Sequence, residues 1–353
     1  MNQQENLNSK VRIKDIANFL NVSIATVDRA LHNRGRINSK TKELILKKVK
    51  ELNYRPDILA RALKTNKSYL IGIIIHWIDI SYHDEILQGI EDVLKTQDYS
   101  MILCTSDNKF EEEKKYINLL QDKSVDGIII LPCRPVTQTS IEVYQQLKDT
   151  GIPFVFILER VNGINVPNII TNEYSGAVSA VEHLIKEGHR KIAHIKGPDN
   201  CWITDQRLNG YTDTIKKYNL DLNGQFVKGT DFTFESGYTA TKQLLGNGSD
   251  RPTAIFACGD IVAMGAYKAI KELGLKIPDD ISLVGFDNLD ISGLIDVPLT
   301  TISQPKYALG KASAEKLMQM IESKNKNNGK AETLSKDIVF EPELIIRQST
   351  RSI

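Results

Sequence analysis

The stretch IKDIANFLNVSIATVDRALH, residues 13–32, decides how the N-terminal part of the chain folds. Its first half repeats apolar residues at helical spacing, which predicts a helix with one apolar face: Ile13, Ile16, Ala17 and Leu20. Asn21 and Val22 interrupt that pattern, and Ser23 can cap a second helix that runs to about His32. Two helices joined by a tight turn are typical of the helix-turn-helix arrangement, whose second helix enters the major groove of DNA.

The second helix is expected to have a packing face and an outward face. Three apolar residues share the face that should pack on the first helix: Ile24, Val27 and Leu31. Four residues at helical spacing share the outward face: Ala25, Asp28, Arg29 and His32. Arg29 can read a guanine edge or clamp a phosphate, and the Ala25 methyl suits a thymine methyl. A surface salt bridge is the alternative for Arg29, while Asp28 and His32 are as compatible with a structural role as with DNA contact.

Charge separates the head from the rest of the chain. Residues 1–64 contain 14 Lys and Arg against 6 Asp and Glu, whereas the remainder contains 31 against 38. A basic head on an acidic body predicts that only the head meets a polyanion such as DNA. A solvated basic tail is the alternative.

Two further helices are predicted before the body begins. A glycine-containing loop at residues 33–36 leads to a third helix over about 39–52. Tyr54-Arg55-Pro56 ends that helix, and Pro56 can begin a short fourth one over residues 57–63.

From Tyr69 onward, strand-sized apolar runs alternate with amphipathic helical stretches. The predicted strands are 70–75, 101–104, 126–131, 153–158, 191–195, 254–257 and 281–285, with a last one near 338–346. The predicted helices are 85–95, 110–122, 174–187, 207–218, 236–245 and 261–273. This alternation predicts an α/β body of doubly wound parallel sheets with helices on both faces, long enough for two lobes.

The head resembles that of the lactose-repressor family of bacterial transcription regulators. The matching residues are Ile13-Lys14-Asp15-Ile16-Ala17, Val22-Ser23, Thr26-Val27, Arg29 and Leu31, and Tyr54-Arg55-Pro56 with Leu59-Ala60-Arg61 and Leu63 resembles the family's hinge helix. The outward face of the second helix and the resemblance together predict DNA contacts at Ser23, Ala25, Thr26, Asp28, Arg29, His32, Tyr54, Arg55, Ala60 and Leu63. It also implies that two protomers insert Leu63 into the minor groove as a wedge that kinks the DNA. A core leucine is the alternative, and so short a helix should depend on DNA and a partner chain to form.

The head also departs from the resembled family. That family usually has Ser where Asp28 stands, Val at Ala30 and Asn at His32. Two of these positions fall on the outward face of the second helix. The operator sequence of better-known members therefore does not carry over to this chain.

The resemblance continues to the C-terminus and implies the fold of type I periplasmic binding proteins. The landmarks include Val125-Asp126-Gly127, Gly188-His189-Arg190, Gly210-Tyr211, Val284-Gly285-Phe286-Asp287 and Gln304-Pro305. This fold has two lobes joined by three crossovers, which are expected near Ile170, Thr301 and Ser335. The predicted domains are 1–56 for the head, 57–68 for the hinge and 69–353 for an effector-binding and dimerisation domain. Its first lobe should hold about 69–170 and 302–335, and its second lobe about 171–300 and 336–353.

A ligand site is expected where the strands of the body end. Asp287 directly follows the 281–285 strand, and ligands of open parallel sheets bind beyond the carboxyl ends of strands. Arg207 opens the helix after the 191–195 strand, and an Arg that donates beside an Asp that accepts suits neighbouring hydroxyls of a polyol. Both match ligand-binding positions of the resembled family, with a structural ion pair as the alternative. The resemblance also assigns Gln304 and a stacking role to Phe232, for which core packing stays open, and Asp260 is expected to cap the following helix.

The mouth of the first strand departs most from the resembled family. His76-Trp77 and Asp79-Ile80-Ser81-Tyr82-His83 stand where the family commonly has Pro-Asp and Ser-Asn-Pro-Phe-Phe, and Gly259 replaces a common Asn. Trp77, Tyr82 and His83 can form a stacking wall for a sugar ring or a planar base. Plain packing between the lobes is the alternative for Trp77.

Several other classes of protein are disfavoured. The chain lacks GxGxxG after the first strand, GxxxxGK[ST], HExxH and GxSxG, so neither catalysis nor a cofactor is expected. Its four cysteines form no CxxC pair, which argues against a bound metal and fits reduced thiols. A polar N-terminus and short apolar runs predict a soluble, cytoplasmic protein. An exported binding protein that feeds a transporter is the alternative, and the basic head counts against it.

The predicted mechanism is that of a homodimeric repressor on a pseudo-palindromic operator. A small molecule, a monosaccharide or simple derivative, is expected to close the lobes and change operator affinity, and a purine is the alternative ligand. Whether the ligand releases the protein from DNA or recruits it stays open. No heptad segment follows Arg351, which favours a dimer over a tetramer.

Overall fold

A computed structural model describes residues 11–31, 35, 37–52, 54, 67–78, 82–221, 226–246, 251–326 and 336–353. Contacts divide the chain into two units, residues 1–68 and 69–353.

The first unit contains helices α1 (Ile13–Phe19), α2 (Ile24–Leu31) and α3 (Ser39–Glu51). Its core consists of five buried apolar residues from all three helices: Ile16, Ala17, Val27, Ala30 and Ile45. Val27 packs inward as expected, but Ile24 is 46% exposed, so its predicted place against the first helix is wrong. The buried residues of α2 are Val27 and Ala30, and at about 100° per residue Ile24 lies about 90° from the middle of that pair, at the edge of the buried face. The predicted hinge helix, residues 57–63, lies outside the described residues.

Two six-stranded sheets form the second unit, one in each lobe. The first-lobe strands are β1 (Leu70–Ile75), β2 (Ser100–Thr105), β3 (Gly127–Ile130), β4 (Phe154–Ile157), β5 (Asn168–Thr171) and β11 (Ile338–Phe340), in the order β11-β5-β4-β3-β1-β2. The second-lobe strands are β6 (Ile192–Ile195), β7 (Val227–Lys228), β8 (Ala254–Ala257), β9 (Ser282–Phe286), β10 (Thr300–Ser303) and β12 (Glu343–Ile345), in the order β12-β10-β9-β8-β6-β7. Every neighbouring pair is parallel except β10 with β12.

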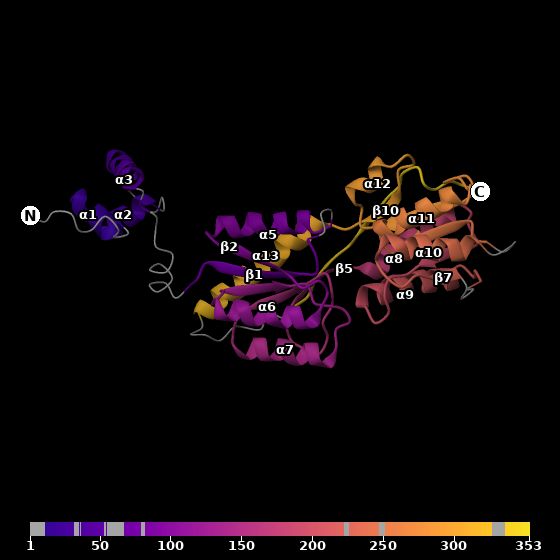
Figure 1. Ribbon diagram of the computed structural model, residues 1–353, viewed down its shortest axis with the longest axis horizontal. Helices are drawn as coiled ribbons and strands as arrows, with labels where there is room; N and C mark the ends of the chain where they lie inside the picture. The colour runs from indigo at the N-terminus through magenta and orange to yellow at the C-terminus, as the bar shows by residue number, and fades with distance from the viewer. Residues whose placement is uncertain are drawn as a thin grey trace, which may run out of the picture. The chain divides into compact units, whose positions relative to one another are not determined.

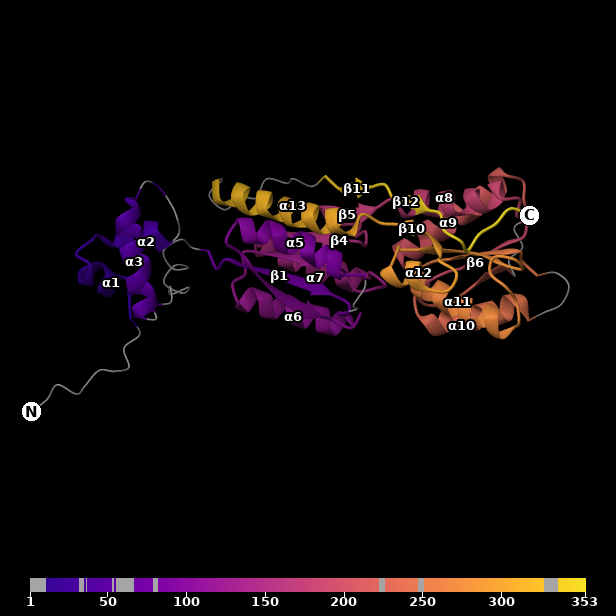
Figure 2. The ribbon, with the colours of Figure 1, turned by 90° about the horizontal axis from the view of Figure 1, so that it is seen from above.

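Helices cover both faces of each sheet, as the alternation of apolar runs predicted (Figure 1). In the first lobe α5 (Asp84–Thr96) and α13 (Lys306–Lys326) lie on one face, and α6 (Phe110–Asp122) and α7 (Gln138–Asp149) on the other (Figure 2). In the second lobe α10 (Phe234–Leu245) and α11 (Asp260–Glu272) face α8 (Glu173–Lys186) and α9 (Trp202–Lys217) across the sheet, and short α12 (Asp290–Leu294) follows β9. The fold is therefore the doubly wound, two-lobed arrangement that the sequence predicted.

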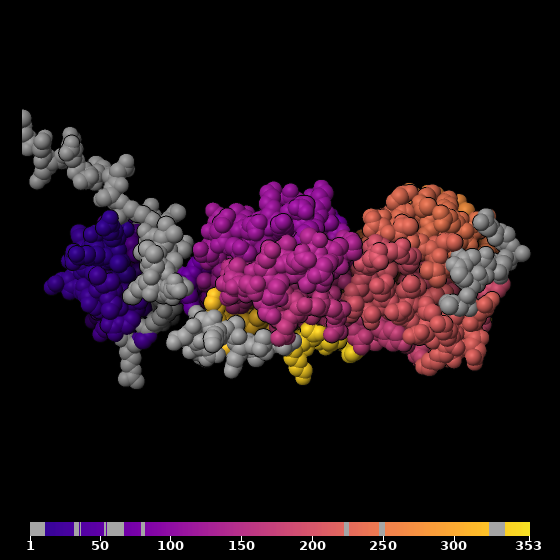
Figure 3. Space-filling view, turned by 90° about the horizontal axis from the view of Figure 1, so that it is seen from below, coloured from indigo at the N-terminus to yellow at the C-terminus, as the bar shows by residue number. Residues whose placement is uncertain are grey.

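The chain passes between the lobes three times: after β5, after β10 and between β11 and β12. The third passage differs from the expectation of a crossover near Ser335, because β11 still pairs with β5 in the first lobe. The single strand expected over 338–346 is two strands in two different sheets. Pro342 lies between them and cannot donate to a strand ladder, which separates the two apolar runs. In the space-filling view the two lobes meet along a boundary (Figure 3).

Candidate functional site

A pocket opens between the lobes, at the carboxyl ends of their strands. Its first-lobe lining consists of Trp77, Tyr82, His83, Leu131, Arg134 and Leu158, and its second-lobe lining of Ile203, Arg207, Phe232, Gly259, Ile261, Asp287 and Leu289. Six of the seven predicted effector residues therefore line one pocket, and the seventh, Gln304, donates to Asp287. The pocket volume is about 110 Å³, below the ~300–1,000 Å³ of pockets for drug-sized molecules, so its size suits a small ligand.

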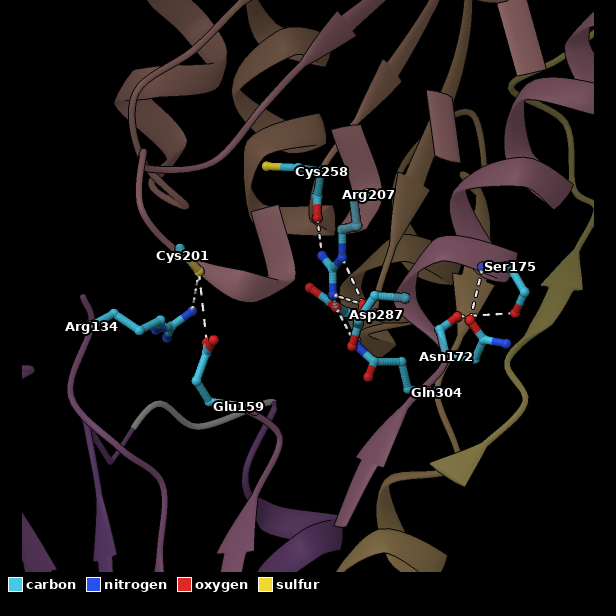
Figure 4. A network of polar contacts seen from close by, with 10 residues as sticks. Arg134, Glu159, Asn172, Ser175, Cys201, Arg207, Cys258, Asp287 and Gln304 are labelled. Atoms are coloured by element: carbon cyan, nitrogen blue, oxygen red, sulfur yellow. Dashed lines mark hydrogen bonds and ion pairs between the residues drawn. The ribbon is translucent and has the colours of Figure 1, made fainter. Parts of the chain in front are cut away.

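Arg207 is the best-connected side chain of the pocket (Figure 4). Its Nε and Nη2 donate to Glu173 Oε2 at 2.8 and 2.7 Å, and its Nη1 donates to the Cys258 carbonyl. Its guanidinium carbon lies 3.6 Å from the centroid of the Phe286 ring. Burial disfavours its charged form, but Glu173 and Asp287 outweigh that effect and raise the pKa of Arg207. Arg207 is therefore held as a fixed cation before any ligand binds.

Asp287 faces the pocket from the loop after β9. Its Oδ1 lies 3.5 Å from Arg207 Nη2 and accepts from Gln304 Nε2 at 2.8 Å, and its side chain remains 18% exposed. Its φ of 106° is a conformation that non-glycine residues rarely adopt, which typically costs ~1–3 kcal/mol and is most often found at binding sites. Burial raises the pKa of Asp287, and the charge of Arg207 opposes that shift.

Sequence reasoning missed Glu173, the ion-pair partner of Arg207. Glu173 is the first residue of α8 and is 1% exposed, although nothing in its sequence context distinguishes it from a surface glutamate. Burial raises the pKa of Glu173, and Arg207 opposes the shift. Arg207 therefore forms a buried ion pair with Glu173, which was the alternative to a ligand-binding role. The carboxylate of Asp287 still lines the pocket.

The three residues predicted to form a stacking wall, Trp77, Tyr82 and His83, line the first-lobe side of the pocket. Trp77 is 42% exposed, and the rings of Tyr82 and His83 meet edge to face at 5.3 Å. Phe232 of the second lobe lies beneath the Arg134 guanidinium, 5.1 Å from its central carbon. Apolar ring surface therefore flanks the polar Arg207–Asp287 pair.

Sequence reasoning also missed Arg134 and Glu159, two first-lobe residues near the pocket. Both contact Cys201 at the start of α9, a residue of the other lobe (Figure 4). Glu159 is 1% exposed, and burial raises its pKa to about 7, against the opposing charge of Arg134. A pattern read along the chain carries no signal for a contact between segments that lie in different lobes.

Asp260 does not cap α11 as expected, because Gly259 occupies the N-cap position. The Asp260 carboxylate instead accepts from the Leu289 amide at 2.8 Å and from the Thr301 hydroxyl at 2.6 Å, and it also accepts from Ser292. Its role is to hold the loop that carries Asp287.

In the first unit, the structure places the described DNA-contact candidates on or beside α2. Ser23 accepts from the Thr26 amide at 3.1 Å, so it caps α2 as predicted, and its hydroxyl lies 2.8 Å from that of Thr26. Ala25 and Arg29 are exposed, and Arg29 Nε donates to the Ala25 carbonyl at 3.1 Å. Asp28 and Tyr54 are half-buried. His32, Arg55, Ala60 and Leu63 lie outside the described residues.

The described residues show neither a metal-binding cluster nor a membrane-spanning helix. Within that part of the chain, no group of three or more His, Cys, Asp or Glu side chains could hold a metal ion. Nor is any helix there long and apolar enough to span a membrane.

Family models match both units of the chain. Residues 12–57 match bacterial regulatory proteins of the lacI family, and residues 181–350 match the periplasmic binding protein-like domain.

Several curated proteins are similar over almost the whole chain. The ribose operon repressor of Halalkalibacterium halodurans is 34% identical over 341 residues, which cover 96% of this chain and 97% of that protein. The transcriptional repressor CytR of Escherichia coli K12 is 33% identical, with 97% and 96% covered. The transcriptional repressor PurR of Histophilus somni 129Pt is 34% identical, with 97% and 99% covered.

Solved structures agree with these relatives. The Lac repressor dimer bound to operator and the anti-inducer ONPF superposes with a TM-score of 0.82 at 28% identity, covering 98% of this chain and 100% of that one. A regulator from Enterococcus faecium with bound ribose superposes with a TM-score of 0.69 at 28% identity, covering 80% and 99%. The chain therefore belongs to the lacI family of bacterial regulatory proteins and is a DNA-binding transcriptional regulator, with a helix-turn-helix head and a two-lobed periplasmic-binding-protein-like body.

Proposed function

We propose that this regulator is a repressor whose operator affinity is controlled by a sugar bound in the pocket between the lobes. The observation that carries the proposal is the pairing of Arg207 with Asp287 at the pocket lining. A guanidinium only donates and a carboxylate only accepts, so together they match two neighbouring hydroxyls. The ribose operon repressor among the relatives and the ribose-bound structural neighbour support this ligand class.

A purine is the second candidate, and a specific observation favours it. Trp77 and Phe232 both line the pocket and offer flat ring surface, which suits a planar base as well as a sugar ring. The PurR relatives are as similar to this chain as the ribose operon repressor is.

The DNA-binding half of the proposal rests on α2. Its exposed Ala25 and Arg29, together with Ser23, Thr26 and Asp28, are assigned to the operator interface, with Tyr54 beyond α3. The chain acts as a homodimer, one head on each half-site, and the Lac repressor dimer on its operator is the structural precedent. It works in the cytoplasm, where the DNA is, and it releases its ligand chemically unchanged.

Intrinsic fluorescence can decide between the two ligand classes, because the chain has two tryptophans and Trp77 lines the pocket. We expect D-ribose to change the emission in a saturable way and hypoxanthine to leave it unchanged. Asp287→Asn should weaken ribose binding roughly tenfold or more, as expected for one hydrogen bond to a charged group. Asp290→Asn is the matched control, because Asp290 lies three residues further on and is exposed. If only hypoxanthine changed the emission in a saturable way, the ligand would be a purine and not a sugar.

Selection from a random duplex library followed by affinity measurement tests the DNA half. Arg29→Ala should weaken binding to the selected duplex by ~1–3 kcal/mol and should relax the sequence preference at one base position. Lys115→Ala removes the same charge from an exposed site on α6 and should change neither property. If the wild type and Arg29→Ala bound the duplex equally well, Arg29 would not be part of the DNA interface.

A further inference from the structure

The N-terminus of α9 in the second lobe is capped by a residue of the first lobe. Cys201, the N-cap residue of α9, makes no side-chain cap hydrogen bond. Glu159, two residues after β4, takes that place: its Oε1 accepts from the Trp202 amide at 3.0 Å. Its Oε2 accepts from Cys201 Sγ at 3.7 Å. A carboxylate is favoured there because the first amides of a helix lack partners and its N-terminus is electropositive.

Arg134 reaches the same point from the loop after β3. Its Nη1 lies 3.9 Å from Cys201 Sγ, and its guanidinium carbon lies 5.1 Å from the centroid of the Phe232 ring in the second lobe. Arg134 and Glu159 therefore hold the Cys201 thiol between them (Figure 4). All of these partners of the two side chains belong to the second lobe.

Arg134 is fixed in this position by its own lobe. Its Nη2 donates to His76 Nδ1 at 2.8 Å, while His76 Nε2 donates to the Pro132 carbonyl at 2.8 Å. Burial, with the charge of Arg134 second, holds the pKa of His76 well below its usual range, so the imidazole is a neutral acceptor. The Arg134 backbone is also held, because its amide donates to Asn108 Oδ1 at 2.8 Å.

We propose that Arg134 and Glu159 form a clasp on Cys201, Trp202 and Phe232 that holds the two lobes closed over the pocket. Opening the lobes removes every second-lobe partner of the clasp at once and leaves a carboxylate and a guanidinium to be resolvated. Arg134 also lines the pocket, and its guanidinium donates to an imidazole and a thiol and lies over a ring, with the charge of Glu159 close by. A ligand oxygen is a stronger acceptor than these, so Arg134 couples ligand binding to lobe closure. The inference rests on the proposed function only in taking the pocket as the effector site.

Cysteine reactivity measures the clasp without any ligand. All four cysteines are buried, but Cys201 is covered by residues of the opposite lobe, whereas Cys104 and Cys258 lie in the cores of single lobes. N-ethylmaleimide labelling of the full chain, followed residue by residue with mass spectrometry, should show slow modification of Cys201 in the wild type. Glu159→Ala and Arg134→Ala should each raise the Cys201 rate roughly tenfold and leave the Cys104 and Cys258 rates unchanged.

Two further variants sharpen the test. Glu159→Gln keeps an oxygen for the Trp202 amide and should raise the Cys201 rate less than Glu159→Ala does. Arg160→Ala removes the neighbouring arginine, whose partner Asp337 lies in the same lobe, and should leave the Cys201 rate at the wild-type value. If none of the three clasp variants raised the labelling rate of Cys201 selectively, the clasp would be wrong. A parallel rise in the labelling rates of all four cysteines would count as such a result. A failure of D-ribose to bind would overturn the sugar proposal without altering these rates, so the two can fail separately.

Discussion

His194 lies in strand β6 with its imidazole between the rings of Tyr211 and Phe256, at centroid distances of 5.2 and 4.7 Å. Its Nδ1 donates to the Phe256 carbonyl at 3.0 Å, and its Nε2 has no partner among the described residues. Burial lowers its pKa from 6.5 to about 4. Because the folded value is the lower one, this residue's contribution to stability is complete above pH 6.5 and is lost as the pH falls through 4.

The His194→Phe variant should remove that acid sensitivity. We expect the wild type to lose up to about 3 kcal/mol of unfolding free energy from this residue between pH 6.5 and 4, and the variant to lose none of it. Urea titrations of tryptophan fluorescence at a series of pH values measure the difference, since Trp77 and Trp202 both report on the second unit. If the unfolding free energy of the variant fell with decreasing pH as steeply as that of the wild type, His194 would already be protonated in the folded state.

Asp260 should show the opposite dependence. Burial, with the charge of Asp287 second, raises its pKa from 3.8 to about 7. A raised carboxyl pKa contributes stability that is complete below pH 3.8 and is lost as the pH rises through 7, by up to about 4 kcal/mol. Asp260→Asn should therefore flatten the decline between about pH 4 and 7 in the same urea titrations. A decline as steep as that of the wild type would assign the effect to another carboxyl group.

At the scale of elements, α5 and α13 cross closely enough that both helices need glycine at the contact. A Cβ on Gly89 would overlap the Tyr307 carbonyl of α13, and a Cβ on Gly310 would overlap the Ile86 carbonyl of α5. Backbone atoms cannot move aside as a flexible side chain can. The second lobe repeats the arrangement, with Gly237 against Val262 and Gly265 against Phe234 where α10 meets α11.

Gly310→Ala should therefore destabilise the first lobe despite the better helix propensity of alanine. We expect a loss of ~1–3 kcal/mol in unfolding free energy, the usual range for overpacking. Gly293→Ala is the matched control, because its Cβ would meet no atom closer than 4.0 Å. Alanine there should be neutral or stabilising by up to ~1 kcal/mol. Equal stability of the two variants would show that the helices can separate freely.

At the scale of the whole molecule, operator binding and effector binding must be coupled reciprocally. If a saturating effector changes operator affinity by some factor, saturating operator must change effector affinity by the same factor, typically ~5–150-fold. Titrating each ligand in the presence and absence of the other measures both factors. In Asp287→Asn, an effector concentration that half-saturates the wild type should change operator affinity much less than it does in the wild type. Unequal factors would mean that a further state or binding site takes part.

The sequence predicted the fold class and most of the pocket, and the reasons lie in particular residues. Asp287 directly follows β9, and every parallel strand of a lobe ends at the same edge. Arg207 does not open its helix as expected, because it is the sixth residue of α9. The position of Asp287 in the pocket could therefore be predicted from its own segment, whereas that of Arg207 rested on the family resemblance. Ile24 and Asp260 were misjudged for a related reason: the periodicity of a helix predicts its faces, but not where the buried stripe starts or which loop meets its first turn.

The sequence by itself determined that a basic helix-turn-helix head precedes an α/β body of two lobes, because periodicity and charge are local properties that a chain carries along its length. Only the tertiary structure decided that Glu173 would pair with Arg207, and that Arg134 and Glu159 would meet Cys201. These partners lie 34, 67 and 42 residues apart and reach one another only after parallel strands and lobe crossings have brought their loops together. Such contacts depend on the packing of whole lobes, which no periodicity within one segment records.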